Sequence, residues 1–210
     1  MVVKSIIFDI GGVLELGRSS KYLKNHSSLG VHEYASKELN LSLDQYFDSI
    51  DTTYAMAIEG QISENESIRI LSLNFKINKK KLLKLYKKAY EKNFKTNKEL
   101  YKFAFKLKKQ GYKIAILSDQ WYLSKKAVVK EKYAKKFNAV VVSCDVGMRK
   151  PNPKIYKLVL KKLNLHAKNC IFIDNQPWNI KPAKKLGMKT ILFKDNKQVF
   201  NQLEKLGVRG

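Results

Sequence analysis

Four side chains able to do chemistry stand at or just beyond the ends of short apolar segments in this chain. They are Asp9, Ser118, Lys150 and Asp174. Because ligands of an open parallel sheet bind beyond the carboxyl ends of its strands, we expect these groups to meet at one edge. Two carboxylates are hard oxygen ligands for magnesium, and a lysine with a hydroxyl suits the charge of a phosphate. The set predicts phosphoryl transfer, in which an aspartate attacks phosphorus and water then releases the phosphate.

The segment around Asp9 is the most informative one. Residues 5–14 read SIIFDIGGVL, so an apolar run of strand type leads directly into a carboxylate and then two glycines. Glycine allows the sharp turn and close approach that a ligand site needs. Gly11 stands where an Asp-x-Asp pair would place a second carboxylate for proton transfer. The chain therefore lacks the usual carboxylate for proton transfer at this position. Loss of such a group typically lowers the rate about a hundred- to ten-thousand-fold.

The elements that must position these residues alternate between strands and helices. Thr96 and Glu99 form a capping-box pattern that would begin a helix running to about residue 110. Asn152 and Pro153 suit the start of another helix, and a further helical stretch lies near 122–136. Short apolar runs predict five strands, at 5–8, 113–117, 139–143, 170–173 and 190–193. This order predicts an α/β fold with a mainly parallel five-stranded sheet.

Between the first two strands the pattern is helical throughout. Apolar residues recur at three- and four-residue spacing in four segments, near 31–39, 43–58, 64–74 and 79–92. This predicts a small all-helical domain inserted into the sheet domain. We expect residues 1–15 and 93–210 to form the core and residues 16–92 to form a helical cap.

The composition sets limits on partners and location. The formal charge is +24, from 42 Lys and Arg against 18 Asp and Glu. The lysines are spread over most predicted helices, which indicates a solvated basic surface and makes nucleic acid an unlikely partner. No run approaches the roughly 18 apolar residues of a membrane span, so we expect a cytoplasmic protein. Cys144 and Cys170 lie in or beside apolar segments and are expected to be reduced.

Four segments, taken in order, resemble the four motifs of the haloacid dehalogenase-like hydrolase superfamily. Segments 8–14, 117–119, 147–153 and 173–175 read FDIGGVL, LSD, GMRKPNP and IDN. Together they span the chain, and the ordered set is far more specific than any one motif. The resemblance implies a Rossmann-like core with a helical cap inserted after the first motif, in agreement with the helical block at 16–92.

The resemblance also implies a role for each motif residue. It implies Asp9 as the nucleophile, with Ser118 and Lys150 as catalytic groups that bind the phosphate. It implies magnesium as the cofactor and a small-molecule phosphate as the substrate. The metal would be held by Asp9, the backbone carbonyl of Gly11, and Asp174. The substrate-binding residues would be Gly12, Ser118, Asp119 and Lys150.

Gly11 departs from the usual phosphatase pattern, and three interpretations follow. In the first, which we adopt, the protein is a phosphatase acting on a sugar phosphate or similar ester. Asp119 then either substitutes as the proton donor, with a raised pKa, or only caps the next helix. In the second, the protein is a dehalogenase or phosphonatase. In the third, it is a catalytically weak phosphate-binding or regulatory protein. Asn175 supports this interpretation, because an uncharged residue there reduces the negative charge that orients the metal ligands.

The remaining candidate residues lie outside the motifs. Trp121 and Trp178 follow motif residues and are expected to pack against the core rather than to line the site. His26, His32 and His166 are isolated and are expected at surface or cap positions without a ligand role.

Overall fold

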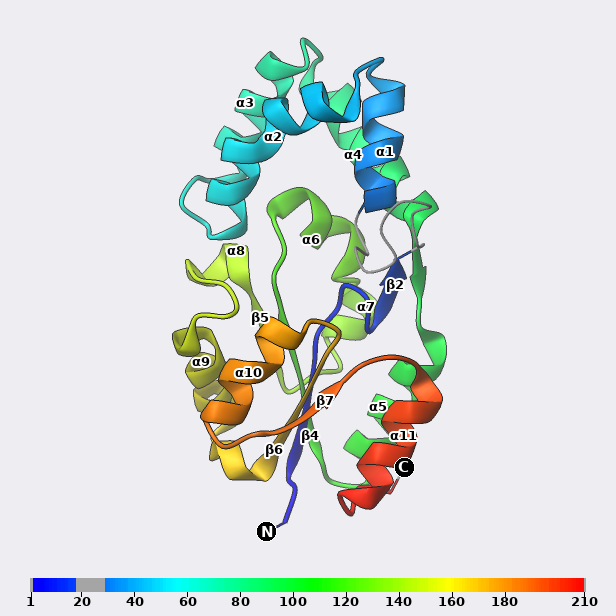
Figure 1. The fold of residues 1–210 in the computed structure, drawn as a ribbon, viewed down its shortest axis with the longest axis vertical. Coiled ribbons are helices and arrows are strands. Elements are labelled where there is room, and N and C mark those ends of the chain that lie inside the picture. Colours follow the sequence, from blue (N-terminus) through cyan, green and yellow to red (C-terminus); the bar gives the residue numbers. More distant parts are fainter. Residues whose placement is uncertain (1, 18–28, 210) are drawn as a thin grey trace.

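A five-stranded parallel sheet forms the centre of the computed structural model, which describes residues 2–17 and 29–209 (Figure 1). Every strand pairing in this sheet is parallel. The predicted α/β fold is therefore confirmed. The strand order is β5-β4-β1-β6-β7, with β1 (Ser5–Phe8), β4 (Lys113–Ser118), β5 (Ala139–Val142), β6 (Cys170–Asp174) and β7 (Lys189–Leu192).

The register of β1 against β6 brings two of the predicted site residues together. Phe8 pairs with Ile173, so the next residues, Asp9 and Asp174, lie side by side where the two strands end. The amide of Asp9 donates to the carbonyl of Ile173 at 2.9 Å, which extends the pairing by one residue. The chain winds outward from β1 through β4 and β5, then returns to β6, so this is the point where the order of the sheet reverses. Such a point is where open α/β sheets bind their ligands.

Both faces of the sheet are covered, which explains why its strands are almost entirely apolar. Ile7 of β1 lies in one core with α9 (Pro153–Leu163) and α10 (Pro177–Lys185). Ile6 and Phe8 lie in the other, with α5 (Lys98–Lys109) and α11 (Asn196–Lys205). Figure 1 shows these two pairs of helices on opposite sides of the strands.

Four helices form a separate layer beyond the carboxyl ends of the strands (Figure 1). They are α1 (Leu29–Glu38), α2 (Leu43–Ile58), α3 (Glu64–Asn74) and α4 (Lys79–Asn93). Each begins and ends within two residues of a segment whose periodicity predicted a helix. We refer to these four helices as the cap.

Two short strands flank the cap in sequence and were not predicted. They are β2 (Glu15–Gly17) and β3 (Phe94–Thr96), which pair antiparallel with Glu15 opposite Thr96. Glu15 is fully buried and accepts hydrogen bonds from Lys130 at 2.8 Å and from Thr96 at 3.1 Å. A strand of three residues is too short to show an alternating pattern, so the sequence carries no signal for it.

Three expected element boundaries were wrong. Asn97, not Thr96, caps α5, because its side chain accepts from the amide of Leu100 at 3.2 Å. Glu99 accepts from Asn196 instead of closing a capping box. The helix expected near 122–136 is broken into α6 (Tyr122–Val128) and α7 (Glu131–Ala134). The strand expected at 139–143 ends one residue earlier, because Ser143 begins a short helix, α8 (Ser143–Val146).

Two smaller expectations concern the cysteines and the membrane. Cys144 and Cys170 are both buried free thiols, as predicted. Within residues 2–17 and 29–209, we find no helix with the length and apolarity that crossing a bilayer requires.

Candidate active site

Asp9 lies at the carboxyl end of β1, and the turn that follows it depends on Gly12. The Asp9 side chain is buried, with only 6% of the residue exposed. Gly12 has a φ of +84°, and a Cβ built there would lie 2.4 Å from Nδ2 of Asn175. Glycine is therefore needed twice, for its left-handed backbone and for the space that Asn175 occupies.

Lys150 connects the carboxylates that follow β1 and β6. Its Nζ lies 3.1 Å from Oδ1 of Asp9 and 2.7 Å from Oδ2 of Asp174. The Lys150 side chain is fully buried, so both ion pairs are shielded from water. Lys150 is therefore a buried residue of the site and not a surface lysine.

Asp174 is held by its neighbours on both oxygen atoms. Oδ1 accepts from the amide of Gln176 at 2.7 Å, which makes a local turn at the end of β6. Oδ2 accepts from Lys150 and, at 3.1 Å, from Nδ2 of Asn179. The carboxylate is thus fixed in orientation before any ligand arrives.

Ser118 and Asp119 extend the cluster from the end of β4. A hydrogen bond from Ser118 to Asp9 favours the ionised form of that carboxyl, and Ser118 Oγ accepts from Gln120 at 3.0 Å. Asp119 Oδ1 accepts from the backbone amide of Lys150 at 3.0 Å. The next helix begins after Trp121 without a side-chain cap, so the idea that Asp119 only caps this helix was wrong.

Burial is the main influence on the charges of the cluster. It raises the pKa of Asp9 to about 7; Lys150 opposes this rise and Asp174 adds to it. Burial likewise raises the pKa of Asp119, again against the effect of Lys150. For Lys150, burial disfavours the charge, but Asp174 and Asp9 outweigh it and raise its pKa above the ordinary value. Lysine therefore stays protonated while Asp9 holds its negative charge at a cost.

The chemistry of the cluster fits magnesium. Asp9 and Asp174 are neighbouring carboxylates, and Gly11 and Asn175 line the same cavity as Asp9. Oδ1 of Asn175 is buried without a hydrogen-bond partner, so an oxygen lone pair is left over beside the carboxylates. No three His, Cys, Asp or Glu side chains gather as a metal site in the described ranges. The donors expected from the sequence are two carboxylates and the Gly11 backbone carbonyl, oxygen ligands of the kind that magnesium takes together with water.

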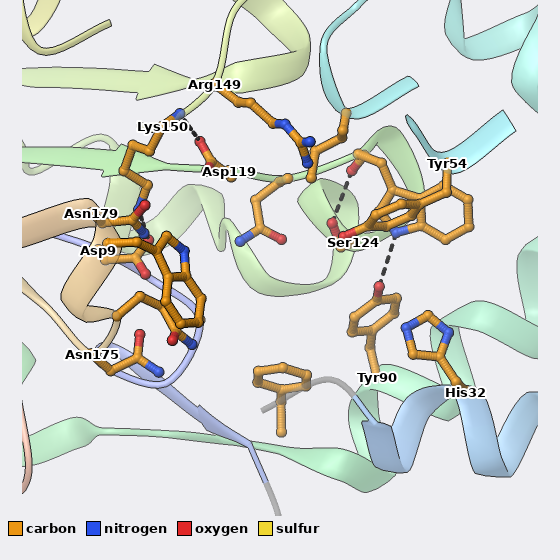
Figure 2. Close-up of a pocket in the computed structure, with 17 residues that line it drawn as sticks. Asp9, His32, Tyr54, Tyr90, Asp119, Ser124, Arg149, Lys150, Asn175 and Asn179 are labelled. Atoms are coloured by element: carbon orange, nitrogen blue, oxygen red, sulfur yellow. Dashed lines mark hydrogen bonds and ion pairs between the residues drawn. The ribbon is translucent and has the colours of Figure 1, made fainter. Parts of the chain in front are cut away.

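A cavity of about 240 Å³ separates this cluster from the cap. Figure 2 shows Asp9, Lys150 and Asn175 on one side of it, facing Tyr90 and His32 on the other. Among the predicted site residues, Asp9, Gly11, Asp119 and Lys150 line this cavity. Gly12, Ser118 and Asp174 are not in its lining and lie behind it.

Several residues of the cavity wall were missed by the sequence analysis. His32, expected to have no ligand role, lines the cavity, as do Tyr54 and Tyr90 of the cap. Trp178 also lines it and is 55% exposed, so its expected packing against the core was wrong. Trp121 is buried, as expected for packing against the core, and it also lines the cavity. Only the docking of cap on core reveals these residues, because nothing in their spacing indicates a shared cavity.

Of the remaining histidines, His166 is exposed at the surface, as expected. His26 lies outside the described residues.

Comparison with known proteins gives three main findings. A family model described as haloacid dehalogenase-like hydrolase matches residues 6–193. A bifunctional epoxide hydrolase 2 from Rattus norvegicus is 43% identical over 70 residues, covering 33% of this chain and 13% of that protein. A glyceraldehyde 3-phosphate phosphatase from Pyrococcus abyssi is 32% identical over 92 residues, covering 41% and 37%. Each match therefore spans well under two thirds of the relative.

Among solved structures, an enzyme of this fold from Bacteroides thetaiotaomicron, in complex with magnesium and inorganic phosphate, superposes with a TM-score of 0.73. The identity is 20%, and the match covers 94% of this chain and 99% of that one. At this identity the likeness shows the fold alone.

Proposed function

The chain belongs to the haloacid dehalogenase-like hydrolase family, and we propose that it hydrolyses a small phosphate ester with the help of magnesium. One observation carries this proposal: the buried Lys150 ammonium lies between the carboxylates of Asp9 and Asp174. Perturbed ionisable groups gathered beside a cavity are typical of active sites. A buried cation beside a carboxylate nucleophile is suited to a phosphate, because it offsets the charge that both reactants bring.

The reaction that these residues support is a double displacement at phosphorus. The Asp9 carboxylate attacks, a bond forms between its oxygen and phosphorus, and the bond to the leaving alcohol oxygen breaks. Water then attacks the aspartyl-phosphate, which releases inorganic phosphate and restores Asp9. Lys150 and Ser118 lie beside Asp9, where they would stabilise the negative charge of the phosphoryl oxygens.

Magnesium would be held by Asp9, Asp174 and the backbone carbonyl of Gly11. When bound, it supplies positive charge that reduces repulsion between the Asp9 carboxylate and the phosphate. The raised pKa of Asp9 supports this assignment, because Lys150 alone does not offset the cost of burying the charge.

Asp119 is the group we propose for proton transfer in place of the missing second carboxylate. Gly11 has no side chain to donate a proton, whereas Asp119 lines the same cavity as Asp9. The Lys150 amide fixes one oxygen of Asp119, and burial raises its pKa. A carboxyl with a raised pKa keeps its proton nearer to neutral pH and so serves as an acid for the leaving group.

The structure bears differently on two alternative functions, a phosphonatase and a phosphate-binding protein with weak catalysis. A phosphonatase that uses a Schiff base needs a lysine reaching in from the cap, and no lysine of α1 to α4 lines the cavity. A phosphate-binding protein with weak catalysis is favoured by two features, the lack of a side chain at Gly11 and the uncharged Asn175 at the cavity. It is the second candidate function.

The test is release of inorganic phosphate from a panel of sugar, alkyl and aryl phosphates, with magnesium and with a chelator. We expect turnover that needs the metal and disappears in Asp9→Asn. Magnesium should also raise the melting temperature of the wild type by binding the folded state. Asp174→Asn should lose that rise. Phosphate binding without turnover on the whole panel would instead favour the second candidate.

A further inference from the structure

An aromatic wall faces the Asp9 cluster across the cavity, and we define it as Tyr54, Tyr90, Phe94 and Trp121. Trp121 is its centre, since Tyr54 of α2 and Tyr86 of α4 both meet it edge to face with ring centroids 5.2 Å away. Trp121 comes from the core, between β4 and α6, so the wall joins the two parts of the molecule. Rings locked against one another in this way form a preorganised apolar surface.

The hydrogen-bonding groups of this wall are largely occupied by one another. Nε1 of Trp121 donates to the hydroxyl of Tyr90 at 3.0 Å. Beside the wall, Nδ1 of His32 lies 3.2 Å from the hydroxyl of Tyr46, which in turn lies 2.8 Å from that of Tyr86. Burial lowers the pKa of His32 to about 4, so this imidazole is neutral and adds no charge beside the wall.

Polar atoms on this side remain available to a ligand. Among the described residues, no hydrogen bond uses Nε2 of His32 or the hydroxyl of Tyr54. Gln120, Ser124 and Asn179 also line the cavity and can hydrogen-bond other polar parts of a ligand. The wall itself therefore offers an apolar surface, with His32 and Tyr54 as polar contacts beside or within it.

Trp178 adds a second apolar surface at the same cavity. It stands in the first turn of α10, shortly after the strand end that holds Asp174, and is mostly exposed. A large exposed indole beside a ligand cavity is available for stacking. The cavity, at about 240 Å³, is smaller than the roughly 300–1,000 Å³ of sites for drug-sized ligands, so it suits a single ring.

We propose that the leaving group of the substrate carries one flat, uncharged ring, which binds between Trp178 and the aromatic wall. His32 and Tyr54 then determine specificity by hydrogen-bonding a polar substituent of the ring. This inference rests on the proposed phosphatase function for the position of the phosphate, which anchors one end of the ligand beside Asp9 and Lys150. It narrows the substrate from phosphate esters in general to phosphates of an aromatic or heteroaromatic ring compound.

The test measures binding, so that leaving-group reactivity plays no part. Phenylphosphonate, cyclohexylphosphonate, ethylphosphonate and inorganic phosphate are titrated by calorimetry into the magnesium-loaded wild type. Ring stacking predicts that phenylphosphonate binds about tenfold more tightly than ethylphosphonate. Cyclohexylphosphonate has similar bulk but no flat π face, and it should bind more weakly than the phenyl compound. Equal affinity for the phenyl and cyclohexyl compounds, or tighter binding of ethylphosphonate, would overturn the proposal.

Variants separate stacking from general damage. Trp178→Ala is exposed and should fold normally, lose about fivefold in affinity for phenylphosphonate, and keep its affinity for inorganic phosphate. Leu73→Ala is the matched control, because Leu73 is 63% exposed on α3 and does not line the cavity. It should change neither affinity. Loss of phenyl affinity in the control as well, or retention of it in Trp178→Ala, would argue against stacking.

Failure of this inference differs from failure of the proposed function. A phenyl preference in a protein without turnover leaves the ring site standing and overturns the phosphatase activity. Phosphate binding and turnover without a phenyl preference would overturn the ring site and leave the phosphatase activity supported. Absence of binding by inorganic phosphate and by every phosphonate would overturn both.

Discussion

The ammonium of Lys150 lies 2.7 Å from the carboxylate of Asp174, and both side chains are completely buried. Lys150 also reaches Asp9 at 3.1 Å, so one cation serves two carboxylates. Burying three charges costs solvation energy. The attraction between the lysine and the two carboxylates offsets this cost only while all three side chains are present. The cluster is therefore a sensitive point for both stability and chemistry.

Removal of the shared cation is the first test. We expect Lys150→Met to lower the free energy of unfolding by about 3–5 kcal/mol at pH 8, because two buried carboxylates lose their partner. The loss should shrink as the pH falls, since protonation of Asp9, whose pKa burial raises, then removes one of the unpaired charges. Denaturant unfolding at several pH values measures it, and phosphate turnover should be abolished. Lys154→Met, at an exposed position nearby, is the control, and equal stability of the two variants would contradict the expectation.

The glycine turn after Asp9 offers a matched pair of variants. Gly12→Ala places a Cβ 2.4 Å from Nδ2 of Asn175 at a φ of +84°, whereas Gly111→Ala has a φ of +94° with open space around it. Both should lose about 1 kcal/mol in unfolding free energy from backbone strain. Only Gly12→Ala should also lose turnover, by about a hundredfold, because it displaces the loop that carries the nucleophile. Similar turnover in the two variants would show that the turn tolerates a side chain.

The role of Asp119 in proton transfer predicts a dependence on the leaving group. Asp119→Asn keeps an oxygen acceptor for the Lys150 amide but has no acidic proton. Turnover of an alkyl phosphate should fall about a hundredfold, and that of p-nitrophenyl phosphate, whose leaving group needs little protonation, should fall much less. Because the raised pKa belongs to the acid, wild-type activity on alkyl phosphates should decline as pH rises through that pKa. An unchanged alkyl phosphate rate in the variant would remove Asp119 from the mechanism.

His32 predicts a loss of stability in mild acid. Its pKa is about 4 in the folded protein, against 6.5 for the unperturbed side chain. Above pH 6.5 both states are neutral and the shift has no effect. As the pH falls toward 4, His32 becomes protonated in the unfolded state but stays neutral in the folded state. The free energy of unfolding therefore falls by about 3 kcal/mol. His32→Gln should show a shallower decline in acid, while the exposed His166→Gln should follow the wild type. Parallel curves for all three proteins would contradict the buried, neutral state of His32.

Much of the core could be predicted because its signals are local. Ile6, Ile7 and Phe8 are buried on both faces of a parallel sheet, so the strand is a continuous apolar run that stands out in the sequence. Asn152 and Pro153 start α9 as expected, with the Asn152 side chain accepting from the amide of Lys154 at 3.0 Å. Errors arose where neighbours decide the boundary. Thr96 became the end of β3 because Glu15 pairs with it, and Asn97 took over as the cap.

The sequence by itself determined the fold class and the order of the motif residues, since strand burial, helix periodicity and turn chemistry are short-range properties. It also showed that Gly11 lacks a proton-transfer group. Only the tertiary structure decided that Lys150 is shared between Asp9 and Asp174, because their spacing reflects strand register and not sequence distance. The same holds for the aromatic wall and Trp178, since cap and core residues far apart in the chain meet only after the cap docks. The reacting groups can therefore be recognised from residue types in the sequence, whereas the shape of the cavity that binds a ligand depends on tertiary packing.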